Sequence, residues 1–235
     1  MRILFILFFA VLAGCASYVT PGGPVRLDAI DREDIAEAAA RKPAAIFPAR
    51  IAIARVQAPD YRSYTTDPLV VGRYSVITTQ ELLTEVQFDE IVAWPKVAGV
   101  APISRLLLPE KLESLDDLRL AAAKLQADVL LVYTLDTSFR IQGRGYGPLT
   151  PISLGLVPDR DAHITTTASA ILTDVRTGFV YGVAEATAKT AGLTNVWGAS
   201  DTVDRKRLEA EGEAFKLLLA EATKTWRGVV KQHGR

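Results

Sequence analysis

The chain is poor in the side chains that carry most enzyme and metal chemistry. It contains one cysteine, Cys15, and two histidines, His163 and His233. A single thiol excludes an intramolecular disulfide, and two histidines so far apart match neither a zinc-ligand spacing nor a Ser-His-Asp arrangement. The sequence therefore offers no residue set for a zinc site or a histidine-based catalytic relay, and no metal or other cofactor is expected.

An excess of charge of either sign is also lacking, because 27 lysines and arginines balance 27 aspartates and glutamates. Binding to nucleic acid relies on surplus basic residues that neutralise phosphates, so nucleic acid is not expected as a partner. Apolar residues, in contrast, make up 49% of the chain. That share is enough for a packed core and predicts a folded domain rather than a disordered stalk.

Long apolar runs are lacking except at the amino terminus, where Met1-Arg2 precedes the apolar stretch 3–12. This stretch is too short for a permanent membrane-spanning helix and has the length of a signal-peptide core. The small residues Ala13-Gly14 then lead directly to Cys15. This order resembles the lipobox of bacterial lipoproteins, which implies that residues 1–14 are removed and that Cys15 carries lipid. The alternatives are an ordinary secretory signal with a chance cysteine at its end, or a buried apolar strand.

The residues around Cys15 predict where the lipid would hold the protein. Ala16 and Ser17 follow the cysteine, and no aspartate stands at the position that retains enteric lipoproteins in the inner membrane. By resemblance to that sorting rule, the protein is expected at the periplasmic face of the outer membrane. Residues 15–30 are predicted to form the lipidated terminus and a tether, since they contain glycine and proline without apolar periodicity. Residues 31–235 are predicted to form a single periplasmic domain.

Apolar periodicity predicts an α/β (α+β) fold with a mixed sheet, helices packed on the sheet, an antiparallel hairpin in the C-terminal half and a long C-terminal helix. Strands are expected at residues 50–57, 74–78, 103–108, 129–139, 163–173 and 179–190. Helices are expected at residues 31–41, 80–92, 114–126 and 201–232.

The expected helices carry specific packing and capping signals. Ser114 is expected to cap helix 114–126 together with Asp117, as in a capping box. Helix 201–232 carries one continuous apolar seam and is expected to pack on the sheet of its own chain. Gly212 lies on that seam, which predicts close backbone contact there. Helix 31–41 is expected to pack through Ile35, Ala38 and Ala39.

Two short motifs give the chain a family resemblance. Ala127-Asp128 precedes an apolar strand segment, and Asp174 to Gly178 supplies an Asp-x-x-Thr-Gly turn between two apolar arms. Over residues 50–190 this pattern resembles the periplasmic domain shared by the curli secretion-channel lipoprotein, the penicillin-binding-protein activator lipoproteins and the amino-terminal domain of the Tol translocation protein. The resemblance implies a non-enzymatic domain that binds another envelope protein or assembles with itself.

A component of an oligomeric secretion channel is one alternative function. The curli channel inserts long amphipathic hairpins, whereas glycine and proline interrupt the matching connection here, residues 140–159, and break the alternation of a membrane strand. The apolar residues in and near this connection are instead candidates for contact with a partner protein or with the membrane, and folding back onto the sheet is the alternative. They are Ile152, Leu154, Leu156 and Trp197.

A lipid-anchored periplasmic hydrolase is the other alternative. It rests only on the polar residue types between Tyr61 and Thr66. These residues also fit a polar binding rim or a loop without a function of its own.

Overall fold

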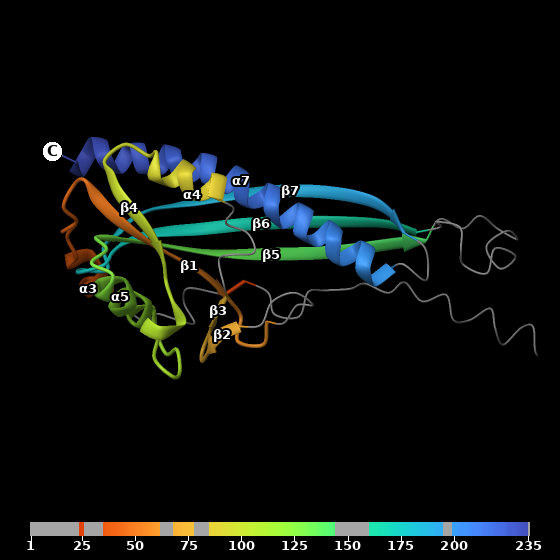
Figure 1. Ribbon diagram of the computed structural model, residues 1–235, viewed down its shortest axis with the longest axis horizontal. Helices are drawn as coiled ribbons and strands as arrows, with labels where there is room; N and C mark the ends of the chain where they lie inside the picture. The colour runs from red at the N-terminus through yellow and green to blue at the C-terminus, as the bar shows by residue number, and fades with distance from the viewer. Residues whose placement is uncertain are drawn as a thin grey trace, which may run out of the picture.

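The computed structural model describes residues 24–25, 35–61, 68–77, 85–143, 160–194 and 199–234. Within these ranges, short helices and strands come first, and three long strands and a long helix complete the fold (Figure 1). In chain order the elements are α3 (Ile35–Ala40), β1 (Ala49–Gln57), β2 (Pro68–Val71), β3 (Ser75–Ile77), α4 (Glu85–Val92), β4 (Val97–Pro102), the 3-10 turn η2 (Arg105–Leu107), α5 (Leu115–Lys124), β5 (Val129–Gly143), β6 (Arg160–Asp174), β7 (Val180–Thr194) and α7 (Ala199–His233).

The described strands join one mixed sheet of seven strands. Its order is β2-β3-β1-β5-β6-β7, and β4 lies beside the first half of β1. β1 runs parallel to β4 and β5, whereas the pairs β1–β3, β2–β3, β5–β6 and β6–β7 are antiparallel. The parallel pairs need crossover connections, which contain α4 and α5. The predicted mixed sheet with helices packed on it is therefore confirmed.

α4 and α7 cover one face of the sheet. The predicted seam of the C-terminal helix is buried there, and the ring of Phe215 lies 4.7 Å from that of Tyr133 on β5. Near the end of α7, Trp226 packs against Trp94 and donates a hydrogen bond of 2.8 Å to the carbonyl oxygen of Pro95. The long helix thus packs on the sheet of its own chain, as predicted.

The opposite face is covered by α5 at one end only. Ser114 and Asp117 form the predicted capping box at the start of this helix. α5 has ten residues and β5, β6 and β7 have 15 each, so the helix is about 15 Å long beside strands of about 50 Å. None of the described helices lies over the far half of these strands on this face (Figure 1).

Some sequence-based expectations are wrong. The strand expected at 103–108 is the 3-10 turn η2, because the hydroxyl of Ser104 accepts a hydrogen bond from Leu106 N and caps the turn. The strand of this region is β4, whose small residues and final proline give no apolar alternation. A Cβ added at Gly212 would meet nothing within 4 Å, so no close backbone contact exists there. On α3, Ile35 is 85% exposed and none of the residues is buried, so its stripe is not a packing face.

Candidate functional site

The predicted lipid attachment site and the predicted contact residues lie outside the described ranges. They are Cys15, Ile152, Leu154, Leu156 and Trp197. The lipid anchor and the contacts of the connection 140–159 therefore stay predictions. Of the polar stretch that suggested a hydrolase, the structure describes only Tyr61.

Tyr61 lies in the interior rather than on a rim. Its hydroxyl oxygen accepts hydrogen bonds from Arg55 Nη2 at 3.1 Å and from Arg207 Nη1 at 3.4 Å. The guanidinium carbon of Arg55 also lies 5.4 Å from the centre of the Tyr61 ring, within cation–π range. All three side chains are buried, so Tyr61 belongs to a polar cluster between β1 and α7.

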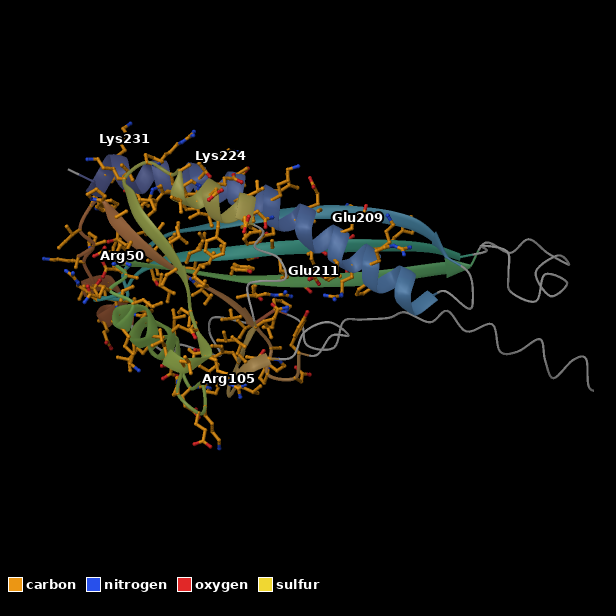
Figure 2. All side chains as sticks on the ribbon, in the orientation of Figure 1. Arg50, Arg105, Glu209, Glu211, Lys224 and Lys231 are labelled. Atoms are coloured by element: carbon orange, nitrogen blue, oxygen red, sulfur yellow. The ribbon has the colours of Figure 1, made fainter. Side chains whose placement is uncertain are left out.

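Glu211 is the acceptor at the centre of this buried cluster. Its carboxylate lies 2.9 Å from Arg207 Nη1 and 3.5 Å from Arg55 Nη2, and it accepts a hydrogen bond of 3.3 Å from Thr137 on β5. Figure 2 shows Glu211 on the sheet-facing side of α7, while Lys224 points outward. Because a buried ion pair is costly to break but specific in geometry, the cluster fixes how α7 lies across the sheet.

Tyr133 lies close enough to this cluster to be influenced by its charges. Burial raises the pKa of the Tyr133 hydroxyl above its usual range, Arg55 lowers it and Glu211 raises it again. The hydroxyl therefore stays protonated and neutral. It is a core group of the helix–sheet contact.

The turn motif of the family resemblance is built around the carboxylate of Asp174. Oδ1 accepts hydrogen bonds from the backbone N–H groups of Arg176 and Thr177, and Oδ2 accepts from Ala44 N and the hydroxyl of Tyr181. Gly178 has a φ of +71°, which confirms the positive φ expected at this turn. The motif therefore joins the hairpin to the segment that precedes β1.

The other motif of the resemblance meets this turn in space. The carboxylate of Asp128 accepts a hydrogen bond from Arg50 N at 3.0 Å, and its backbone carbonyl accepts one from Val175 N at 3.0 Å. Asp128 thus links the start of β1 to the β6–β7 turn. Both motifs therefore hold separate segments of the fold together.

The middle of β5, β6 and β7 carries polar side chains on the face that α5 covers only at one end. The register of the three strands places these side chains opposite one another. The hydroxyls of Thr167 and Thr187 lie 2.9 Å apart, and the hydroxyl of Ser169 donates a hydrogen bond of 3.0 Å to the carboxylate of Glu185. We call this surface the open face. It consists of Thr134, Asp136, Ser138, Thr165, Thr167, Ser169, Val183, Glu185, Thr187 and Lys189.

A groove of about 360 Å³ lies where the open face meets the core under α5. Its size falls within the usual range of protein binding pockets. Val183, one of the lining residues, has 66% of its surface exposed. The groove is lined by Pro24, Val25, Val56, Val132, Thr134, Ser169, Ala170, Ile171, Val183, Ala184 and Glu185.

The residues Pro24 and Val25 form one wall of this groove. Val25 packs against the core cluster that contains Val56, Val132 and Ile171. The segment that follows the predicted lipid attachment site therefore reaches the open face, far along the sequence from the strands that form it.

The sequence analysis did not single out the open face. A signal was present, because polar residues at 165, 167 and 169 and at 185, 187 and 189 alternate with alanine or another small residue. Such alternation predicts a strand with one solvated face. It does not show that the adjacent groove is apolar, because the lining residues come from four separate strands and the tether.

Two further features, a metal-binding cluster and a membrane-spanning helix, are absent from the described ranges. No cluster of three or more histidine, cysteine, aspartate or glutamate side chains is arranged to hold a metal ion there. None of the helices described has the length and apolar character needed to cross a membrane.

Comparison with known proteins identifies no family. No protein-family description matches the chain, and no curated protein matches it. Among solved structures, the hypothetical protein CT253 from Chlamydia trachomatis is similar at 12% sequence identity, with a TM-score of 0.29, over 77% of this chain and 97% of that chain.

Proposed function

We propose that the protein is a lipid-anchored envelope protein whose open face binds another protein in the periplasm, as a non-enzymatic binding module. The observation that carries this proposal is the open face with its adjoining groove. A sheet face that combines a small apolar depression with a polar surround has the composition of a protein-binding surface.

The groove has apolar surface that can bind a side chain of a partner and polar groups that can orient it. Val183 and Ile171 supply apolar surface, while Thr134, Ser169 and Glu185 supply hydrogen-bonding groups at its edge. An apolar side chain of the partner would displace water from the groove. The polar groups would orient the backbone that carries it.

The predicted anchor supports the same proposal through its short tether. Pro24 lies nine positions after Cys15, and nine extended residues span at most about 32 Å. With lipid on Cys15, the groove would lie within that distance of the bilayer surface. Partners attached to the membrane or projecting from it would be within reach.

Neither alternative function gains support from the described residues. The hydrolase proposal depended on an accessible polar stretch, and Tyr61, its described member, is 1% exposed. The channel proposal depends on the connection 140–159, most of which lies outside the described ranges.

Site-specific photo-crosslinking from Thr134 tests the proposal. A photoreactive residue at Thr134, in the groove wall, is expected to capture one envelope protein in cells, identified by mass spectrometry. Val183→Arg should abolish that adduct, since the long charged side chain would cover the groove. Val86→Arg on α4 is the matched control because Val86 is 75% exposed on the other side of the sheet. An adduct that survives Val183→Arg would contradict the proposal.

A further inference from the structure

β7 is the last strand of the sheet and has one edge without a strand partner among the residues described. Its inner edge pairs with β6 from Arg160 opposite Thr194 to Thr173 opposite Val180. The strand has 15 residues, long for an edge strand. Its free edge presents N–H and C=O groups that can pair with another strand.

α7 leaves part of this edge accessible because it crosses the sheet at an angle. Its amino-terminal half contacts β5 and β6, since Ala210 packs against Phe139 and Ile164. Its later part reaches β7, where Thr225 donates a hydrogen bond to the carbonyl oxygen of Val183. Beyond Val183, α7 still covers the face of β7 that carries Ala184 and Ala188, and Figure 1 shows the helix diverging from β7 toward the end of that strand.

The charges on this part of β7 are arranged for pairing with a second copy. Glu185, Thr187 and Lys189 are exposed on the open face. In an antiparallel pair centred on Thr187, Glu185 of one copy lies opposite Lys189 of the other, and the reverse pair follows by symmetry. Opposite charges in such positions stabilise a sheet and like charges destabilise it.

Other registers lose this complementarity. A two-fold axis at Glu185 or at Lys189 would place like charges opposite each other. An axis at Ala186 or Ala188 would leave both charges without an oppositely charged neighbour. An edge lysine usually discourages strand pairing. With Thr187 on the two-fold axis, however, Glu185 of the other copy lies opposite Lys189 and compensates its charge.

We propose that two copies of this chain pair through their β7 strands, antiparallel and with Thr187 on the two-fold axis. The two sheets then form one continuous sheet, and the two open faces lie side by side on it. This dimer does not depend on the groove binding a partner. It would present two grooves on one surface.

Disulfide trapping of the full-length chain in cells tests the register. Opposite residues in an antiparallel pair have Cα atoms about 4.5–5.5 Å apart, which suits a disulfide, so Thr187→Cys should give a reducible dimer under mild oxidation. Leu120→Cys on α5, where Leu120 is 59% exposed, is the matched control. The parent chain reports any contribution from Cys15. A yield from Thr187→Cys no higher than that of the control would overturn the proposal.

Charge reversal in the Thr187→Cys background tests the pairing itself. Glu185→Lys alone and Lys189→Glu alone each create two like-charge pairs and should lower the dimer yield about 2- to 30-fold. The double variant restores opposite charges and should recover the parent yield. Failure of the double variant to recover would contradict this register. If the Thr134 crosslink is lost while the Thr187→Cys dimer is retained, only the proposed binding of a partner in the groove is contradicted.

Discussion

At the scale of single residues, Asp174 joins three parts of the fold through one carboxylate. Burial alone would raise its pKa, but hydrogen bonds from Ala44 N, the Tyr181 hydroxyl, Thr177 N and Arg176 N outweigh that cost and hold the pKa below its usual range. The folded protein therefore favours the ionised form more than the unfolded chain does. Its contribution to stability is present above the unfolded pKa of about 3.9 and is lost as the pH falls through the lower folded value.

Asp174→Asn is expected to destabilise the protein by about 1–3 kcal/mol at pH 7, because an amide NH₂ group would face backbone donors that now meet an oxygen. Urea unfolding followed by circular dichroism measures the difference. As the pH falls below about 4, Asp174 becomes protonated and the wild type loses its extra free energy of unfolding over the variant. The urea midpoints of the two proteins should therefore converge. A constant difference from pH 7 to pH 2 would show that ionisation of Asp174 does not contribute.

The sequence revealed the role of some of these residues but not their partners. The Asp-x-x-Thr-Gly turn was recognisable because its hydrogen bonds to Arg176 and Thr177 are local. The bond from Ala44 was not, since 130 positions separate it from Asp174. The buried pair of Arg55 and Glu211 was also missed, because charged residues are normally solvated and these two lie 156 positions apart.

At the scale of elements, the contact between β7 and α7 depends on Gly182. A Cβ added there would lie 2.6 Å from Cγ2 of Thr225. Thr225 cannot rotate away freely, because its hydroxyl donates to the carbonyl oxygens of Val183 and Glu221. The glycine thus allows the helix to approach the strand closely.

Gly182→Ala is accordingly expected to destabilise the protein by about 1–3 kcal/mol through overpacking. Thr225→Ser removes the clashing methyl group and keeps the hydroxyl, so Gly182→Ala should cost much less in the Thr225→Ser background. A double-mutant cycle of thermal or urea unfolding measures this coupling. Additive effects of the two changes would rule out the steric explanation.

Elements with strong periodicity were predictable, and short or weakly patterned ones were not. β1, α5, the β6–β7 hairpin and α7 all match expected segments within a few residues. β2 and β4 were missed, because they are short and contain proline or small residues. The alternation at residues 185–189 indicates one polar side of β7. It could not reveal that α5 is too short to cover the other side, since that depends on how elements distant in sequence meet.

At the scale of the whole molecule, the sheet is covered unequally. α7 and α4 protect one face, whereas α5 protects only one end of the other. The tether residues Pro24 and Val25 reach this second face. The described part of the predicted tether and the proposed binding surface therefore meet on the same face of the sheet.

Cys15→Ser is expected to move the protein from the membrane fraction to the soluble periplasmic fraction without altering its fold. Each buried methylene of an acyl chain contributes about 0.8 kcal/mol to membrane binding, and two chains are needed for stable anchoring. Cell fractionation with immunoblotting measures the shift, and Ala16→Ser is the neighbouring control. Retention of Cys15→Ser in the membrane fraction would show that something other than lipid holds the protein there.

The parallel pairing of β1 with β5 also determines how the chain must fold. Eight of the nine residues of β1 are buried, and Ile51 pairs with Val129, far along the sequence. The β6–β7 hairpin, in contrast, closes across a short turn and can form as soon as it is synthesised. A chain is made from its amino end, so β1 is complete long before the strand that covers its edge exists. During that interval the nascent chain exposes an apolar strand, and it is then that it depends most on chaperones to prevent aggregation.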